Sequence, residues 1–239
     1  MTNSKFLLDK VKLASVDLDS HLSVNPTSQS GALTPDVLRQ GQAMAFQRIM
    51  KLGLIAGGEW GSGFVVAKVP AQNGVGFQWS APSFFKVAGG SVGLTGAIES
   101  VHTIIVMATT AGAAKFAHGV SFAGPDFDLT FANDYSSRGM KTATESKIPK
   151  GEILACTKVS GGFAVDISFS GGTISCDHAS NKACYGGDYT PEQILSGAVE
   201  PPPEFQPIYQ KLYAKMGTEA TSNIQAEASL ATHTWNAAP

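Results

Sequence analysis

The stretch LIAGGEWGSGFVVAKVPAQNGVGFQWSAPSFFKVAGGSVGL, residues 54–94, decides the fold, because it sets many glycines among residues that favour strands. Residues 64–66 are aromatic or β-branched and suit a pleated, half-buried surface. Glycine permits bulges and close backbone approach, and Asn73-Gly74 is typical of a hairpin turn. The stretch therefore predicts strand, turn and strand in a bent, closely packed sheet. We expect no room for a valine side chain at Gly63 or Gly90.

Blocks of residues within and beyond this stretch resemble the SYLF domain family. The blocks inside it are GSGFVVAK at 61–68, WSAPSFF at 79–85 and GGSVGL at 89–94. Further blocks follow in the family's order: Gly96-Ala97, Gly162-Phe163-Ala164 with a strand to Gly171, Asn181 with Tyr185-Gly186, and ILSGAVEPP followed by Tyr209 and Leu212. The resemblance covers about residues 35–212. It departs from the family pattern where acidic residues are expected, with Val101-His102 at one place and Ser170 at another.

The resemblance implies a function. SYLF proteins are similar to one another in binding phosphoinositide membranes, and some bind and bundle actin filaments in endocytosis or membrane remodelling. The family therefore implies a non-enzymatic protein, cytoplasmic and peripheral to the membrane, without cofactor or metal. Family membrane binding is associated with an amphipathic segment at the N-terminus. In this chain that segment would place these residues at the lipid: Lys5, Phe6, Leu7, Leu8, Lys10 and Lys12.

Length and composition describe one folded domain with extensions. The chain has 239 residues, of which 43% are hydrophobic and 15% charged, so it can bury a substantial core. Its formal net charge of −2 gives no global attraction to nucleic acid, and we expect no nucleic-acid partner. Asp9 interrupts the N-terminus before a signal-peptide core forms, so we expect no secretion. We assign an N-terminal helix and linker to 1–33, a SYLF-like domain to 34–216 and a tail to 217–239.

Residues 4–22 have the periodicity of a helix that is apolar on two faces. One stripe holds Leu7, Val11, Ala14, Leu18 and Leu22, and the opposite side holds Phe6, Leu13 and Val16. Such a helix either packs between the core and a partner or lies at a membrane interface with its lysine heads in water. On the membrane hypothesis, Leu7→Asp weakens binding more than Lys10→Ala, and deletion of residues 1–24 leaves the domain folded.

The remaining segments predict an α+β fold. Thr34-Pro35 begins a helix. Periodicity would let this helix run through Leu38, Ala45, Ile49 and Leu52 to Gly53, whereas the family resemblance implies a short helix broken at Gly41 and a strand near 43–46. We follow the resemblance, because a glycine inside a helix costs about 1 kcal/mol relative to alanine. Strands are also expected at 103–108, 152–158 and 163–169, and helices at 110–117, at 190–196 after a capping box, and around Ile208 and Leu212. Together they indicate a strongly curved antiparallel sheet closing toward a barrel, with helices packed at the N-terminus and C-terminus.

A cationic segment spans residues 135–151. Its basic residues are Arg138, Lys141, Lys147 and Lys150, against Glu145 alone. A run of charge is usually a solvated loop, but this one could instead receive an anionic headgroup or an acidic protein surface.

The signals for catalysis or metal binding are weak. Ser91 in GGSVG matches a nucleophile-elbow pattern, with Asp126, Asp128, His178 and His233 later in the chain, but the residues after it read as strand rather than helix. Cys176, His178 and Cys184 fit no tight metal-ligand spacing. Besides the lipid- and actin-binding module, two hypotheses stay open: a self-assembling structural protein and a serine hydrolase that uses Ser91.

Overall fold

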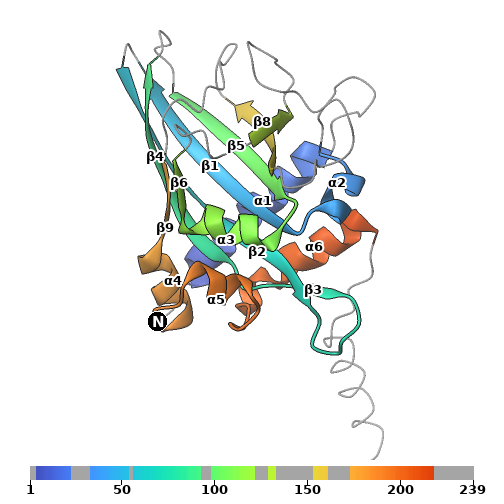
Figure 1. The fold of residues 1–239 in the computed structure, drawn as a ribbon. Coiled ribbons are helices and arrows are strands. Elements are labelled where there is room, and N and C mark those ends of the chain that lie inside the picture. The colour runs from blue at the N-terminus through green and yellow to red at the C-terminus, as the bar shows by residue number, and fades with distance from the viewer. Residues whose placement is uncertain are drawn as a thin grey trace, which may run out of the picture.

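The computed structural model describes residues 4–22, 33–53, 56–92, 98–121, 129–132, 153–160 and 173–217. The helices are α1 (Ser4–Leu22), α2 (Pro35–Gln40), α3 (Thr110–His118), α4 (His178–Tyr185), α5 (Pro191–Leu195), the 3-10 turn η1 (Pro203–Phe205) and α6 (Gln206–Met216). The strands are β1 (Ala43–Gly53), β2 (Ala56–Pro70), β3 (Phe77–Trp79), β4 (Ser83–Val92), β5 (Ile98–Met107), β6 (Gly119–Ser121), β7 (Leu129–Ala132), β8 (Ile153–Ser160) and β9 (Thr173–Cys176). Figure 1 shows their arrangement.

The described strands form one mixed sheet in the order β6-β9-β4-β2-β1-β5-β8-β7, with β3 paired to β2. All neighbours are antiparallel except β7 and β8. The predicted α+β class is confirmed. The predicted closure toward a barrel is not, because β6 and β7 lie at opposite ends of the strand order and are not paired with each other in the described part. Curvature of the long central strands bends the sheet without closing it.

Glycine allows the central strands to approach closely at some positions but not at all of those predicted. A Cβ atom at Gly63 would overlap the carbonyl oxygen of Phe46 and the ring of Phe85, so the lack of a side chain is required there. At Gly90 the nearest atom to such a Cβ among the described residues is the Gly57 oxygen at 4.0 Å. The expected crowding is therefore present at Gly63, and the expectation for Gly90 is wrong because its surroundings are open.

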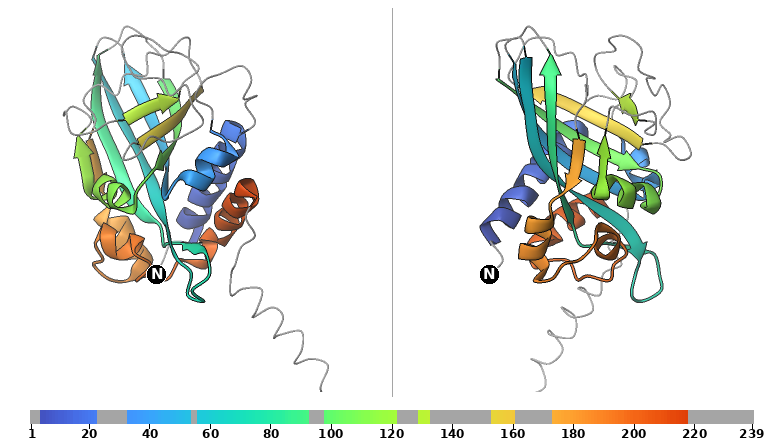
Figure 2. Two further views of the ribbon diagram at one scale, coloured as in Figure 1. Left: turned by 45° about the vertical axis from the view of Figure 1, so that its right-hand side comes forward. Right: turned by 60° about the vertical axis from the view of Figure 1, so that its left-hand side comes forward.

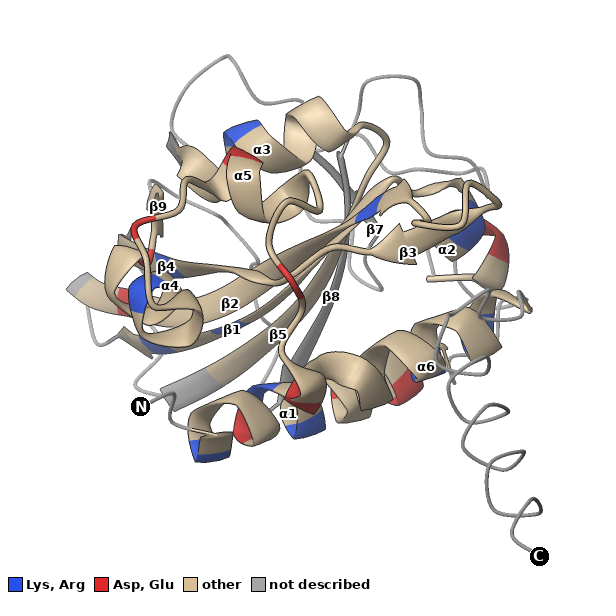
Figure 3. Cartoon of the chain, turned by 90° about the horizontal axis from the view of Figure 1, so that it is seen from below, with Lys and Arg blue, Asp and Glu red and all other residues tan. Residues whose placement is uncertain are grey.

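Helices cover both faces of the sheet, which Figures 2 and 3 show as a layer with α1, α2 and α6 on one side and a layer with α3 and α5 on the other. Alternation along β1 supplies both interfaces, since Met44 and Phe46 point to the first layer and Ala45 and Ile49 to the second. The first core contains these large side chains: Leu7, Leu18, Leu38, Phe64, Phe84, Phe205 and Leu212. The second is built around Val65, Phe85, Ile105 and Phe116. In the described part of the sheet, helices therefore bury both faces of the central strands.

Three residues from the later sequence blocks hold the segment that follows β3. The Tyr209 hydroxyl donates to the Ser80 carbonyl at 2.8 Å, and the Tyr185 hydroxyl donates to the Pro82 carbonyl at 2.5 Å. The Asn181 side chain accepts from the Phe84 amide at 2.9 Å. These bonds satisfy backbone groups where the chain leaves one strand and begins another. The blocks that resemble one family in sequence therefore meet in space, and their role here is structural.

Local signals predicted most element boundaries. Helix α2 ends at Gln40, Gly41 donates its amide to the Val37 carbonyl, and β1 begins at Ala43. The capping box at Thr190 and Gln193 is present. Strand β1 runs further than the expected 43–46, because pairing with β2 and β5 extends it to Gly53. The strand expected at 163–169 lies outside the described residues.

Candidate functional site

Helix α1 carries most of the residues that the sequence assigns to binding, and its inner stripe is part of the core. Leu7 is 1% exposed and Leu18 is fully buried, and Val11 and Ala14 lie between them on the same stripe. The helix contacts α6, η1 and β5. Because this stripe meets the sheet and the C-terminal helix at once, α1 is a structural part of the domain rather than a separate arm.

A polar cluster fixes α1 to the sheet at its C-terminal half. Asp17 accepts from Arg48 at 2.6 and 2.9 Å and lies 2.8 Å from the Nδ1 atom of His102. Burial alone would raise the pKa of the Asp17 carboxyl, but the hydrogen bonds from His102 and Arg48 outweigh it and leave this pKa below its ordinary value. Asp17 is therefore ionised at neutral pH. A buried, bidentate carboxylate of this kind sets the rotation of the helix about its axis.

This cluster bears on a departure from the family pattern. His102 occupies the part of β5 where an acidic residue was expected. In the structure the His102 side chain contacts the carboxylate of Asp17. A carboxylate is therefore present beside this part of β5, but it comes from helix α1. The pairing of Asp17 with Arg48 could not be predicted from periodicity, because 31 residues separate the two in the sequence.

The structure divides the six predicted lipid-contact residues into two groups. Leu7 is core, and the partly buried Phe6 packs its ring 5.6 Å from that of Phe84. Lys10 turns toward the sheet, where its Nζ donates to Ser62 at 2.6 Å and lies 5.4 Å from the centre of the Phe6 ring. Burial lowers the pKa of Lys10. With α1 docked, these residues are not available to a flat surface.

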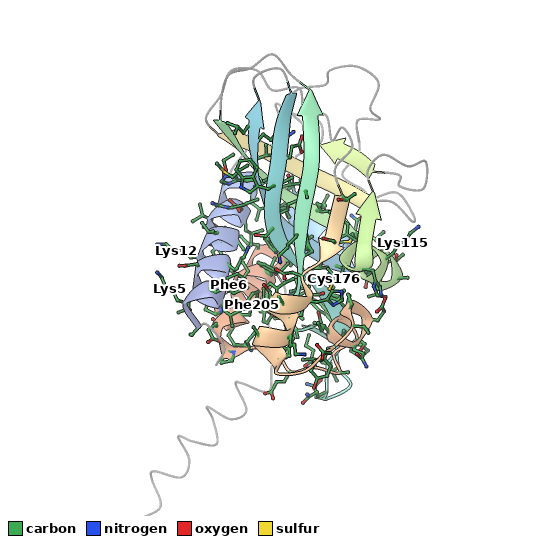
Figure 4. All side chains as sticks on the ribbon, turned by 90° about the vertical axis from the view of Figure 1, so that its left-hand side faces the viewer. Lys5, Phe6, Lys12, Lys115, Cys176 and Phe205 are labelled. Carbon is green, nitrogen blue, oxygen red and sulfur yellow. The ribbon has the colours of Figure 1, made fainter. Side chains whose placement is uncertain are left out.

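The other three residues, Lys5, Leu8 and Lys12, point outward. Together with Val16 they form what we call the outer face of α1. Figure 4 shows Lys5 and Lys12 extending away from the sheet, and Lys115 on the opposite side of the molecule. Leu8 is 51% and Val16 is 55% exposed. Asp9 is also exposed, whereas Asp19 pairs with Lys211 and Lys215 of α6. The outer face thus combines apolar side chains with a small cationic excess.

A second exposed apolar group lies on β1 and β2 beyond the helices. Met50 and Trp60 are opposite each other in the register, and Leu52 follows on the same face. Their exposed fractions are 37%, 51% and 46%. Trp60 therefore lies at the rim of the core rather than inside it.

The remaining candidate residues are outside the described structure or lack the context for chemistry. Arg138, Lys141, Lys147 and Lys150 lie outside the described residues, and a lipid or partner role for them stays a prediction. Ser91 belongs to β4, opposite Gly57 of β2, and the next described element is strand β5. The strand-to-helix turn of a nucleophile elbow is therefore not found in the described part of the chain.

No group of three or more His, Cys, Asp or Glu side chains in the described residues is placed to hold a metal ion. Among the helices that the structure describes, none is both long enough and apolar enough to cross a bilayer.

Comparison with known proteins identifies the family. Residues 88–215 match the family model Ysc84, described as Las17-binding protein actin regulator. The chain is 29% identical over 204 residues to LAS seventeen-binding protein 3 of Saccharomyces cerevisiae, a match that covers 84% of this chain and 43% of that protein. It is 27% identical to Protein YSC84 of the same organism, covering 80% and 40% of the two chains. To SH3 domain-containing YSC84-like protein 1 of Xenopus laevis it is 27% identical, covering 75% and 52%.

These matches define a class of binding domain rather than a whole protein. The family match includes more than half of the chain, so the chain belongs to the Ysc84 family, and its resemblance to SYLF domains is confirmed. The chain spans only about half, or less, of the length of the curated relatives it matches. No solved structure matches the chain significantly.

Proposed function

We propose that the chain is a non-enzymatic binding module that acts in actin regulation. The observation that carries the proposal is the family match over residues 88–215, which extends from the middle of β4 through α6. Relatives whose names refer to Las17 binding and to YSC84 match over most of this chain. The fold supports a binding role, because its described residues build packed layers and exposed faces rather than a catalytic constellation.

Sedimentation with actin filaments tests this proposal. The chain of residues 1–239, kept at constant concentration, is centrifuged with increasing filament concentrations and once without filaments. We expect a saturable fraction of the protein to pellet with the filaments. Light scattering of the protein alone identifies self-assembly, which would make it pellet unaided. A protein that remains in the supernatant at every filament concentration contradicts direct filament binding.

A second role, docking on anionic phosphoinositide membranes at the cytoplasmic surface, is supported by the outer face of α1. Lys5 and Lys12 against Asp9 leave an excess of one positive charge, worth about 1 kcal/mol near an anionic leaflet, or about fivefold in affinity. Full burial of a large aliphatic side chain contributes about 1.5 to 3 kcal/mol. The apolar residues Leu8 and Val16 therefore supply the larger share of the binding free energy. The helix stays docked on the domain, and its outer face meets the lipid.

We predict that Leu8→Asp weakens binding to phosphoinositide liposomes more than the double change Lys5→Ala with Lys12→Ala. Each variant has a matched control on a distant surface: Val75→Asp, at a side chain that is 62% exposed, and Lys115→Ala on α3. Liposome sedimentation at low and high salt measures both. The lysine variants should lose their difference from the wild type at high salt, because screening weakens exposed charges, whereas the Leu8→Asp difference should persist.

Unchanged liposome binding by Leu8→Asp would contradict a membrane site on the outer face of α1. If Leu8→Asp binds liposomes as the wild type does, the outer face of α1 is not the membrane site, and the segment with Arg138 and Lys150 becomes the next candidate. Leu7→Asp is not a usable test, since Leu7 is buried and its replacement would unfold the protein.

A further inference from the structure

A pocket lies between the first turns of α1 and helix α4, apart from the outer face of α1. Its volume is about 260 Å³, and it is lined by Phe6, Leu7, Lys86, Asp177, Ala183 and Cys184 among others. We call it the α1–α4 pocket. It joins elements from the two ends of the chain with the β4 strand between them. Figure 4 labels Phe6, which lines the pocket, on α1.

The inner wall of the α1–α4 pocket is apolar. Leu7 belongs to the first core, and Phe6 and Cys184 pack against the same core from outside. Burial raises the pKa of the Cys184 thiol to about 11, so this side chain is uncharged at neutral pH. Ala183 adds only a methyl group from α4. This wall offers dispersion contacts and no strong hydrogen-bond donor, which suits a hydrocarbon chain or ring.

The mouth of the α1–α4 pocket carries an ion pair. Lys86 pairs with Asp177 at 3.0 Å, and its side chain is 58% exposed. Asp177 is already satisfied by Ser180, whose amide and hydroxyl donate at 3.2 and 2.7 Å. Lys10 is close enough for the charge of Asp177 to favour its protonated form. Lys86 is thus the cation in the lining of the pocket, and its ammonium, which pairs with Asp177, has N–H donors left for an incoming anion.

We propose that the α1–α4 pocket binds an apolar chain that ends in an anionic group, with the chain against Phe6, Leu7 and Cys184 and the anion at Lys86. At about 30 Å³ for a water-sized group, the pocket holds on the order of nine such groups, a size that fits a medium-length alkyl chain. The inference is independent of actin binding. A ligand here contacts both α1 and α4 and therefore stabilises the docked position of α1.

The first experiment uses decanoate as the probe and the chain of residues 1–239 as the protein. Calorimetric titration measures binding, and decanol serves as the uncharged analogue. A second readout is the rate of alkylation of Cys184 at mildly alkaline pH, with Cys176, which does not line the pocket, as an internal reference. We expect saturable decanoate binding, weaker binding of decanol, and selective protection of Cys184.

Two variants separate the wall from the mouth. Ala183→Leu fills the pocket with a residue that favours helices, and we expect at least about a tenfold loss of decanoate affinity. Lys86→Gln removes the cation, and we expect about a fivefold loss that disappears at high salt. Lys115→Gln on α3 is the matched charge control. Unchanged unfolding midpoints show that each variant is folded.

Vesicles distinguish the two sources of such a ligand. Protection of Cys184 by decanoate identifies a free amphiphile, and protection only by vesicles that contain an anionic phospholipid identifies a bilayer lipid; either result supports the pocket. Equal decanoate affinity of the wild type and Ala183→Leu, or no protection of Cys184 by either probe, overturns the proposal.

Discussion

Gly63 lies on β2, the middle one of three neighbouring central strands. It is opposite Gln47 of β1 and Phe85 of β4, and a Cβ there has no space between the Phe46 carbonyl and the Phe85 ring. Gly90 lies on β4, opposite Gly58, and is exposed. Two glycines that look alike in the sequence therefore serve different ends, because only one of them is packed on its Cβ side.

We predict that Gly63→Ala lowers the free energy of unfolding by about 1 to 3 kcal/mol, the usual cost of overpacking a core. Gly90→Ala should leave it unchanged or raise it by up to about 1 kcal/mol, since the substitution restricts the unfolded chain without a clash. Urea unfolding of both variants measures the difference. Equal stabilities would show that the strands at Gly63 can separate without cost.

At the scale of elements, α1 is the part of the protein for which the structure changes the interpretation most. Its inner stripe closes the first core, and Asp17 anchors it to Arg48 and His102. The opposite side of the helix carries Leu8 and Val16 in solvent. One apolar face of α1 therefore packs in the core, and the other is exposed and can bind a partner.

We predict that Leu18→Ala lowers the free energy of unfolding by about 2 to 5 kcal/mol, as other large-to-small changes in a core do. Leu8→Ala, on the same helix but half exposed, should change it by less than about 0.5 kcal/mol.

Deletion of residues 1–24 should abolish cooperative unfolding, contrary to the expectation that the domain from Pro35 folds alone. Circular dichroism in urea measures the unfolding of the deletion variant. If this variant still unfolds cooperatively, α1 is not a structural part of the domain.

At the scale of the whole molecule, Lys68 lies where the helical layer meets the sheet. Its Nζ donates to the carbonyls of Leu38 and Arg39 at 3.2 and 2.8 Å, which caps the end of α2, and it lies 4.8 Å from the centre of the Phe77 ring. Burial lowers the pKa of Lys68 to about 8. The neutral amine can keep both hydrogen bonds without a desolvated charge.

This pKa links Lys68 to the pH dependence of stability. The unfolded lysine titrates near pH 10.4, so between about pH 8 and 10.4 the unfolded chain binds a proton that the folded protein has lost, and the Lys68 contribution to stability rises with pH. We predict that the stability of the wild type relative to Lys68→Met increases by about 1 kcal/mol from pH 7 to pH 9. The comparison with Lys68→Met is needed because the pKa of Cys184 is raised to about 11, so that this thiol makes the stability of the wild type fall as pH rises. Urea unfolding at each pH measures the stability of both proteins. If the two stabilities change with pH in the same way, the pKa of Lys68 is not lowered.

Much of the local structure follows from the sequence by itself. The period of residues 4–22 predicted α1, and the capping box at Thr190 predicted α5. The break at Gly41 before β1 followed from the family resemblance, because periodicity alone favoured a helix that continued to Gly53. The blocks around residues 61–94 and 181–212 indicated the family, which the match at 88–215 confirms. These signals depend on neighbouring residues, and neighbours in sequence are fixed before any tertiary contact forms.

Only the tertiary structure decided which surfaces are open. Periodicity showed that α1 has two apolar faces, but the choice between them depends on the sheet and α6, which come from distant segments. The burial of Leu7 and Lys10, the meeting of Asp17 with His102 across 85 residues, and the α1–α4 pocket all follow from that choice. The physical reason is that a helical pattern specifies directions about its own axis, whereas burial is set by the partner that the fold brings to one side.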